Sequence, residues 1–200
     1  MGSKKRILLK IFFIFSLFSL SNALFGGVAI EKGISVTTEL GVYQSIPAEK
    51  HNDELPVRTH LTLGTSLEPV ILRLTKKSEL SLAISGYYTT RSIVHGVTIW
   101  RPFVAVGPSL NYTFHINDYF AFRAATAAFV SVYTQTSEMI PLFRFTVAPE
   151  YEIAPNKKKN HWVLTVPISL DVRDSYLSVS TTVGFKWKLD TQKEIVGEKN

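Results

Sequence analysis

Hydrophobic and polar residues alternate along most of this chain with a period of two residues. The clearest case is the segment 177–189, where Leu, Val, Thr, Phe and Trp at every second position are separated by Ser, Thr, Gly and Lys. Successive side chains of a β-strand point to opposite faces, so the segment is predicted to be a strand with one apolar and one polar face. The same pattern recurs from about residue 34 onward. The sequence therefore predicts an all-β chain.

About eight such segments follow one another, separated by short stretches that are rich in turn-forming residues. The clearest breaks are 76–78, 117–118 and 154–160. No segment after residue 23 has the periodicity of a helix. The predicted strands are 34–46, 56–68, 79–90, 98–116, 119–134, 142–153, 162–173 and 176–189. An even number of short strands joined by turns is typical of an antiparallel up-and-down barrel.

The polar face of the predicted strands distinguishes a membrane barrel from a soluble one. Between 104 and 116 this face is small and mostly uncharged, and it carries Ala105, Gly107, Ser109, Asn111, Thr113 and His115. A water-exposed sheet would instead be rich in Lys and Glu, whereas small uncharged side chains fit the narrow interior of a barrel of about eight strands. We therefore expect a transmembrane β-barrel with its apolar face in lipid. A soluble lipocalin-like carrier is the alternative fold, and the small polar face argues against it.

The first 23 residues have the layout of a secretory signal peptide. Lys4, Lys5 and Arg6 precede an apolar run over 7–20, and small residues stand at Ser21 and Ala23. The run is shorter than the roughly 20 residues that span a bilayer as a helix. We expect cleavage after Ala23. The predicted organisation is a signal peptide at 1–23, a barrel at 24–190 and a periplasmic tail at 191–200.

Charge and cysteine content exclude several classes of function. The leader holds four of the 22 basic residues and none of the 16 acidic ones, so the net charge of the remainder is only +2. No basic stripe with interleaved aromatics is present, and nucleic-acid binding is not expected. The chain has no cysteine, which excludes a lipoprotein anchor, a disulfide and a thiolate metal site.

Charged residues on the inward face form a nearly balanced set. A basic side chain facing lipid near the midplane would cost about 2–4 kcal/mol, so these residues are expected in the lumen. There they would pair and hydrogen-bond, and they would fill a narrow lumen rather than line a wide pore. The predicted lumen charge network consists of Glu39, Arg58, Glu68, Arg123, Arg144, Glu150, Asp171 and Lys186.

Aromatic residues gather at one rim when the strands are folded as an up-and-down barrel. An aromatic ring with a polar edge prefers the membrane interface, where one side meets lipid and the other meets water. With both termini in the periplasm, this rim is periplasmic, and the segments 46–55, 91–97, 135–141 and 173–175 face outward. The predicted interface aromatics are Tyr112, Phe114, Phe120, Phe122, Tyr151, Trp162, Phe185 and Trp187.

Two short segments resemble small outer-membrane barrels of the OmpW/OmpX class. Residues 101–107 read RPFVAVG and residues 111–114 read NYTF, which is similar to the OmpW-type pattern of a basic residue, Pro, an aromatic, Val, small residues, Gly and then Asn-Tyr-Thr. The match covers about one strand. Such barrels usually end on an aromatic residue that the insertion machinery reads, whereas here 190–200 follow the last strand. The resemblance implies passage of small, apolar molecules through a narrow channel.

The expected function is therefore that of an outer-membrane barrel with a structural or porin-like narrow-channel role. Its expected partners are membrane lipid, the insertion machinery and a small-molecule solute, and it is expected to be a monomer. A lipid-modifying enzyme is the competing class, with Ser92 and His95 or Asp174 and Ser175 as candidates, but neither pair has a recognisable nucleophile and base pattern. No cofactor is expected. The histidines are too scattered for a metal site: His51, His60, His95, His115 and His161.

Overall fold

The computed structural model describes residues 29–47, 58–90, 92–94, 97–100, 102–153, 160–173 and 176–194. All regular structure in this part of the chain is β-sheet. The strands are β1 (Ala29–Pro47), β2 (Arg58–Thr75), β3 (Ser78–Thr89), β4 (Ser92–Val94), β5 (Val97–Trp100), β6 (Phe103–His115), β7 (Phe120–Tyr133), β8 (Met139–Ile153), β9 (Asn160–Thr165), β10 (Ile168–Arg173) and β11 (Tyr176–Glu194).

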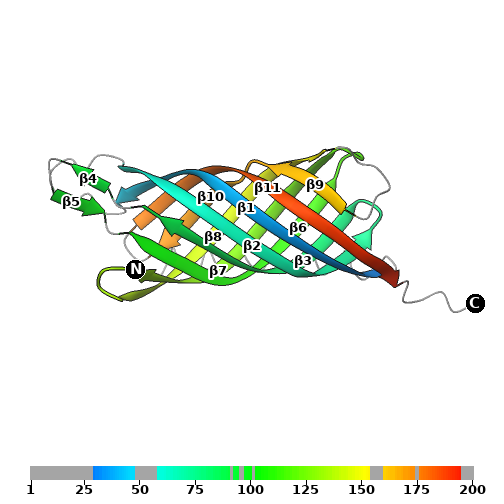
Figure 1. Cartoon of the computed structure of the whole chain (residues 1–200), viewed down its shortest axis with the longest axis horizontal. Helices are drawn as coiled ribbons and strands as arrows, with labels where there is room; N and C mark the ends of the chain where they lie inside the picture. The colour runs from blue at the N-terminus through cyan, green and yellow to red at the C-terminus, as the bar shows by residue number, and fades with distance from the viewer. Residues whose placement is uncertain are drawn as a thin grey trace, which may run out of the picture.

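Nine of these strands form one closed antiparallel ring (Figure 1). The ring closes where β1 pairs with β11, in unbroken register from Ile34 opposite Leu189 to Pro47 opposite Tyr176. β9 and β10 both lie between β8 and β11, so eight positions surround the axis. The prediction of an antiparallel barrel of about eight strands is confirmed. Closure leaves the ring without an unpaired sheet edge. A sheet in lipid needs such closure, because lipid cannot hydrogen-bond to exposed backbone groups.

β9 and β10 are two halves of the single strand that the sequence predicts over 162–173. Thr165 pairs with Glu150 and Ile168 pairs with Val147, which is the same register on both sides of the gap. Pro167 lies in the gap and has no N–H to donate. Its carbonyl still accepts a hydrogen bond of 3.0 Å from the Thr182 N–H. The proline therefore interrupts the hydrogen bonding without shifting the strand.

The predicted strand 98–116 is wrong as a single element. β5 pairs with β4 in a separate two-stranded sheet, and β6 enters the barrel only at Phe103. Pro102 lies between them and lacks the N–H that a continuous ladder would use. β4 and β5 form a hairpin that projects beyond one end of the barrel (Figure 1). This hairpin occupies part of the expected outer loop 91–97.

The predicted strand 56–68 also ends too early, since β2 continues to Thr75. The register between β2 and β3 shifts between Leu67 and Val70, which marks a β-bulge at Pro69. Pro69 and Val70 both face outward, and the alternation resumes with Ile71 inside. A bulge adds one residue to one strand and so reverses the phase of the pattern beyond it. At the other end of the chain, β11 continues to Glu194, past the expected boundary of the tail at 190.

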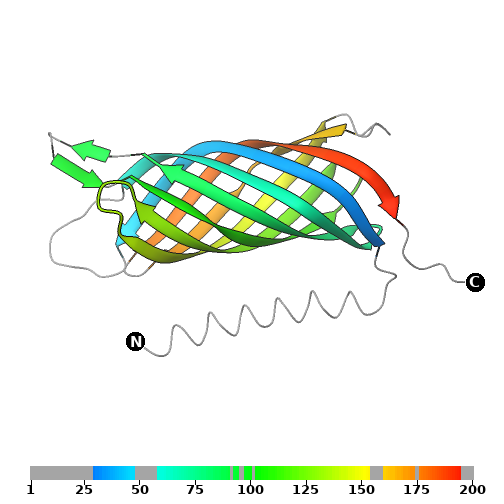
Figure 2. The same cartoon turned by 60° about the horizontal axis from the view of Figure 1, so that its bottom comes forward.

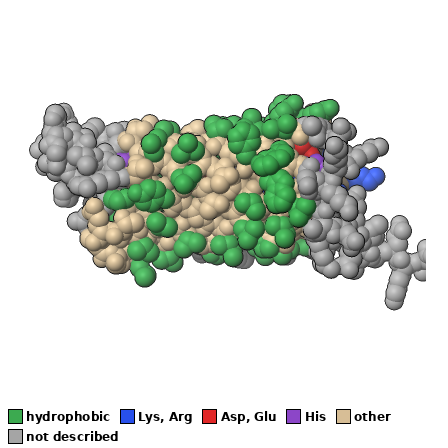
Figure 3. All heavy atoms as spheres, viewed as in Figure 1, with side chains coloured by type: hydrophobic (Ala, Val, Ile, Leu, Met, Phe, Trp, Pro, Cys, Tyr) green, Lys and Arg blue, Asp and Glu red, His purple; other side chains and the backbone are tan. Residues whose placement is uncertain are grey.

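The two faces of the barrel are the reverse of those of a soluble protein. In β6, Phe103 and Ala105 are fully buried inside, while Val104 and Val106 are 42% and 51% exposed on the outside. Apolar side chains are spread over the outer wall, and in this view acidic and basic ones are visible only near the end where β11 ends (Figure 3). Among the described residues, no helix has the length and apolar character needed to cross a membrane.

The two ends of the barrel differ in the connections that they carry (Figure 2). The start of β1, the end of β11 and the short turns 76–77 and 116–119 share one end, which we call the proximal end. The Asn117 side chain accepts hydrogen bonds from the N–H groups of Tyr119 and Phe120 at 2.9 and 2.8 Å and closes its turn. The turn 134–138 and the β4–β5 hairpin lie at the other, distal end.

Candidate functional site: the interior of the barrel

The charged side chains of the lumen are arranged in three layers along the barrel axis. The distal layer contains Arg144 and Asp171 with the aromatic rings around them, the middle layer contains five charged residues, and the proximal layer is centred on Glu79. The five residues of the middle layer are Glu39, Glu68, Arg123, Glu150 and Lys186. Each comes from a different strand, in the order β1, β2, β7, β8 and β11.

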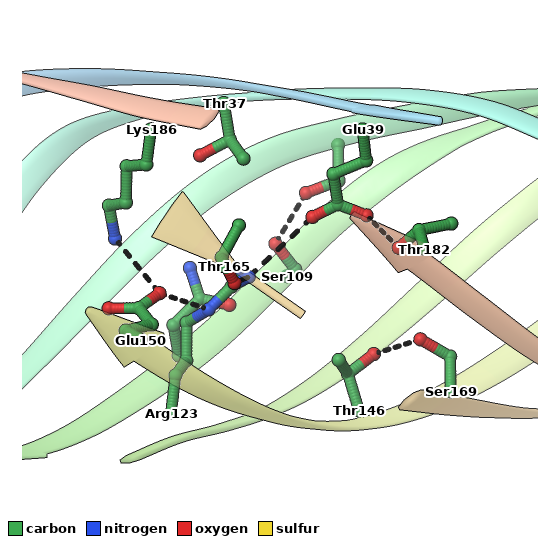
Figure 4. Close-up of polar contacts among 12 residues, drawn as sticks. Thr37, Glu39, Ser109, Arg123, Thr146, Glu150, Thr165, Ser169, Thr182 and Lys186 are labelled. Carbon is green, nitrogen blue, oxygen red and sulfur yellow. Dashed lines mark hydrogen bonds and ion pairs between the residues drawn. The ribbon is translucent and has the colours of Figure 1, made fainter. Parts of the chain in front are cut away.

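The middle layer is a chain of ion pairs across the lumen (Figure 4). Lys186 Nζ lies 2.8 Å from Glu68 Oε1 and 4.0 Å from Glu150 Oε1. Arg123 Nε lies 2.9 Å from the same Glu150 oxygen, and Arg123 Nη2 lies 3.6 Å from Glu39 Oε1. The side chains of Glu68, Glu150 and Lys186 are each 2% exposed. A buried charge costs several kcal/mol unless it is paired, so these five residues hold one another in place.

Neutral side chains complete the hydrogen bonding of the middle layer. The Ser81 hydroxyl donates to Glu68 Oε2 at 2.9 Å, and the Thr182 hydroxyl donates to Glu39 Oε2 at 3.1 Å. Arg123 Nη2 donates to Thr165 Oγ1 at 3.4 Å. The small polar residues of the inward face make these contacts. Ser and Thr are short enough to fit beside the larger charged side chains and to hydrogen-bond to them.

Two glycines flank Glu39, and one of them makes room for its side chain. In the register of the ring, Glu39 lies between Gly64 of β2 and Gly184 of β11. A Cβ at position 184 would lie 2.6 Å from the Thr38 carbonyl oxygen and 2.7 Å from Glu39 Cγ. The glycine therefore allows the Glu39 side chain to lie flat across its neighbour and to reach Arg123.

The distal layer is built on one bidentate ion pair. Arg144 donates from Nε and Nη2 to the two oxygens of Asp171 at 2.6 and 2.8 Å. The Tyr87 hydroxyl donates to Asp171 Oδ2 at 2.8 Å, and the Arg144 guanidinium lies 3.6 Å from the centre of the Tyr87 ring. Parallel N–H bonds to a carboxylate fix geometry strongly, and the cation over the ring adds to this.

Aromatic rings close the lumen around this ion pair. Tyr43, Tyr87, Phe103 and Phe129 pack in edge-to-face or stacked contacts with centroids 5.5 to 6.2 Å apart. All four are at most 4% exposed. Arg173 lies 4.7 Å from the centre of the Phe103 ring on the distal side. The distal layer is thus a plug of aromatic rings that surround the Arg144–Asp171 ion pair.

The proximal layer surrounds Glu79 with basic groups. Glu79 Oε1 lies 3.0 Å from Arg73 Nη2 and 3.2 Å from His115 Nε2, and Glu79 Oε2 lies 3.7 Å from Lys188 Nζ. The Arg73 side chain is 36% exposed. This layer is therefore wetter than the other two.

A small cavity separates the middle and distal layers. Its volume is about 50 Å³, and its wall includes Glu39, Ser66 and Arg123 toward the middle layer and Tyr87 and Arg144 toward the distal layer. A buried water needs roughly 10–15 Å³, so the cavity has room for about three to five waters. The middle and distal layers form its two ends along the barrel axis.

The structure places the predicted lumen charges in two of the three layers. Glu39, Glu68, Arg123, Glu150 and Lys186 lie together, and Arg144 pairs with Asp171 apart from them. Arg58 begins β2, but its side chain lies outside what the structure describes. Glu150, which its position near a turn would place in water, is buried and paired.

Sequence reasoning missed the proximal layer and the inward aromatic rings. Glu79 and Lys188 are in phase with inward residues of their own strands, and so are Tyr87 and Phe103. The alternation along each strand was therefore the signal that could have identified these residues as inward-facing. The prediction for aromatic residues covered only those at one rim and left Tyr87 without a role, although Tyr87 lies between the inward Ser85 and Thr89.

The eight predicted interface aromatics all lie on the outward face near the proximal end. Phe114 pairs with Phe122, Phe120 with Tyr151, and Trp162 with Trp187. The remaining two, Tyr112 and Phe185, point outward on β6 and β11. The candidate enzyme residues give no site in the structure: the side chain of Ser92 and all of His95, Asp174 and Ser175 lie outside the described residues.

No protein-family model and no curated protein matches this chain. Solved structures do match it. The crystal structure of Ail, the attachment invasion locus protein of Yersinia pestis, has 14% sequence identity, covers 80% of this chain and 99% of that chain, and gives a TM-score of 0.47. Neisserial surface protein A has 9% identity, with coverages of 79% and 97% and a TM-score of 0.49. These are small outer-membrane β-barrels.

Proposed function

We propose that this protein spans a bacterial outer membrane as a closed, structural barrel. The observation that carries the proposal is the combination of an apolar outer wall with three charged layers inside. A soluble barrel would have the reverse arrangement, because charged groups prefer water and apolar groups the core. In a membrane, the apolar wall meets lipid and the charges pair inside.

The proposed orientation follows from the two ends of the barrel. The proximal end, where β1 begins, β11 ends and the short turns lie, faces the periplasm, and the distal end with the β4–β5 hairpin faces outward. The ring of outward aromatics then lies at the inner interface of the membrane. Export by a signal peptide that is cleaved after Ala23, insertion by the outer-membrane machinery and a monomeric state belong to the same proposal.

Localisation tests the proposal first. The protein should be found in the outer-membrane fraction, and folded protein in detergent should migrate differently from boiled protein in electrophoresis. A mature chain that is fully soluble without detergent would overturn the membrane assignment. The same preparation tests the enzyme alternative: lipid hydrolysis that is lost in Ser92→Ala or Ser175→Ala would show that the protein is an enzyme.

A narrow channel for small solutes is the second candidate function, and the small cavity between the middle and distal layers is the observation that favours it. The closed layers argue against it. Planar-bilayer recordings of the refolded protein separate the two. We expect no conductance from the wild type, and none from Arg123→Ala, because the aromatic plug of the distal layer remains in place.

A combined variant provides the positive control for these recordings. Arg123→Ala with Tyr87→Ala and Phe103→Ala removes large side chains from both layers and should conduct ions. Conductance in the wild type that changes in Arg123→Ala would replace the structural role by the channel role.

A further inference from the structure

The turn between β2 and β3 carries two exposed lysines, Lys76 and Lys77. They differ from Lys186 in the lumen, which is buried 2.8 Å from Glu68. Neither Lys76 nor Lys77 forms an ion pair with another residue in the described part of the chain. Among the described residues, the basic side-chain atoms visible in Figure 3 lie at this end of the barrel. The described part of the protein therefore leaves two positive charges at the proximal rim without a paired acid.

The backbone of this turn is held on both sides. The Lys77 N–H donates to Thr75 Oγ1 at 3.2 Å, and the side-chain oxygens of Thr75 and Ser78 lie 2.7 Å apart. The Lys77 carbonyl accepts a hydrogen bond of 2.7 Å from the His115 N–H at the end of β6. The two lysine side chains thus extend from fixed positions, and little backbone freedom is lost when they bind a ligand.

The turn lies just beyond the ring of outward aromatics. Ser78 pairs with Phe114, which is 44% exposed on the outer wall, and Lys77 is the next residue toward the rim. One residue of a strand advances about 3.3 Å, and the headgroup region on each side of a bilayer is about 5–7 Å thick. With Phe114 at the membrane interface, the ammonium groups of the turn lie at the depth of the lipid headgroups.

We propose that Lys76 and Lys77 bind anionic phospholipid in the inner leaflet of the outer membrane, an inference that rests on the proposed membrane orientation. Lysine is a common ligand of phosphate groups. The neighbouring turn 116–119 adds one exposed acid, Asp118, so the two turns together have a net charge of one positive unit. A zwitterionic headgroup has no net charge to complement this rim, whereas an anionic headgroup does.

The test measures which lipid the protein retains. The refolded protein is placed in vesicles that contain equal amounts of phosphatidylcholine and phosphatidylglycerol, extracted into detergent and analysed by native mass spectrometry. One basic residue near an anionic membrane surface raises the affinity about fivefold, so we expect phosphatidylglycerol to be retained over phosphatidylcholine by at least about fivefold. The double variant Lys76→Gln with Lys77→Gln should retain the two lipids almost equally. Lys76→Arg with Lys77→Arg keeps both charges and is the matched control, which should behave as the wild type.

Three results would overturn the proposal. Equal retention of the two lipids by the wild type would show that the rim does not select anionic lipid. An unchanged preference in the glutamine variant would place the bound lipid elsewhere. Loss of the preference in the arginine variant would show that positive charge is not its cause. The proposed function is tested separately, by the heat-modifiable mobility of each protein refolded in phosphatidylcholine alone: a protein that folds there without any lipid preference retains the membrane assignment.

Discussion

Neighbouring residues of one strand have opposite environments in this barrel. Tyr87 and Tyr88 follow each other in β3, yet Tyr87 is buried in the distal layer and donates to Asp171, whereas Tyr88 is 38% exposed on the outer wall. The same side chain therefore contributes through different interactions at the two positions. The hydroxyl matters energetically only where it meets a buried carboxylate.

Removing the two hydroxyl groups one at a time tests this difference. Tyr87→Phe should lower the free energy of unfolding by about 1.5–3 kcal/mol, because Asp171 loses a donor inside the plug. Tyr88→Phe should change it by less than about 0.5 kcal/mol. The measurement is urea-induced unfolding of the protein in lipid vesicles, followed by tryptophan fluorescence. Equal losses in both variants would contradict the assignment of faces.

The sequence is sufficient to predict which side of a strand each residue faces, but not which residues meet. Alternation places Lys186 and Glu68 inside. Their 2.8 Å contact joins β11 to β2, which are separated by β1 in the ring, and it depends on the stagger between strands. A shift of two residues between strands keeps every face and changes every partner. Pairing inside a barrel is thus a property of register.

At the scale of strands, Gly107 of β6 lies directly against the backbone of β7. A Cβ at this position would clash with the carbonyl oxygen of Ala128 and would lie 3.0 Å from Phe129 Cα. Neither of these two atoms can move aside easily, because both belong to the backbone of β7. Gly64 of β2 differs, since a Cβ there would lie 3.5 Å from the nearest atom, Glu39 Oε2.

Alanine at these two glycines should therefore have unequal effects. Gly107→Ala should destabilise the protein by about 1–3 kcal/mol, because the two strands must separate locally. Gly64→Ala should stay within about 0.5 kcal/mol of the wild type. Urea titration in vesicles measures both variants. If Gly64→Ala is as harmful as Gly107→Ala, close strand approach is not the cause.

Strand prediction failed where proline altered the ladder. Pro69 introduces a bulge that reverses the phase in β2, and Pro102 separates the β4–β5 hairpin from β6. Pro167 leaves the register intact. All three prolines lack the same N–H, so the difference comes from how the neighbouring strands accommodate the missing bond. The hydrophobic pattern along one strand does not show how its neighbours accommodate the missing hydrogen bond.

At the scale of the whole molecule, the proposed orientation distinguishes two exposed turns. The turn at 134–136 lies at the distal end and the turn at 76–77 at the proximal end. An epitope inserted after Gln135 should bind antibody on intact cells, and the same epitope inserted after Lys76 should bind only after the outer membrane is permeabilised. Insertions in exposed tight turns usually leave the fold intact. The reverse pattern would invert the proposed topology.

The pairing of β1 with β11 has a consequence for how the protein forms. Ile34 pairs with Leu189, so the first strand to be synthesised has to wait for the last before one of its edges is covered. Until then both ends of the growing sheet can recruit other chains, which is how aggregation begins. A chain that stops before β11 is not a smaller barrel but an open sheet with two reactive edges. Time spent unclosed in the periplasm, rather than the strength of any one contact, is then the main hazard of its biogenesis.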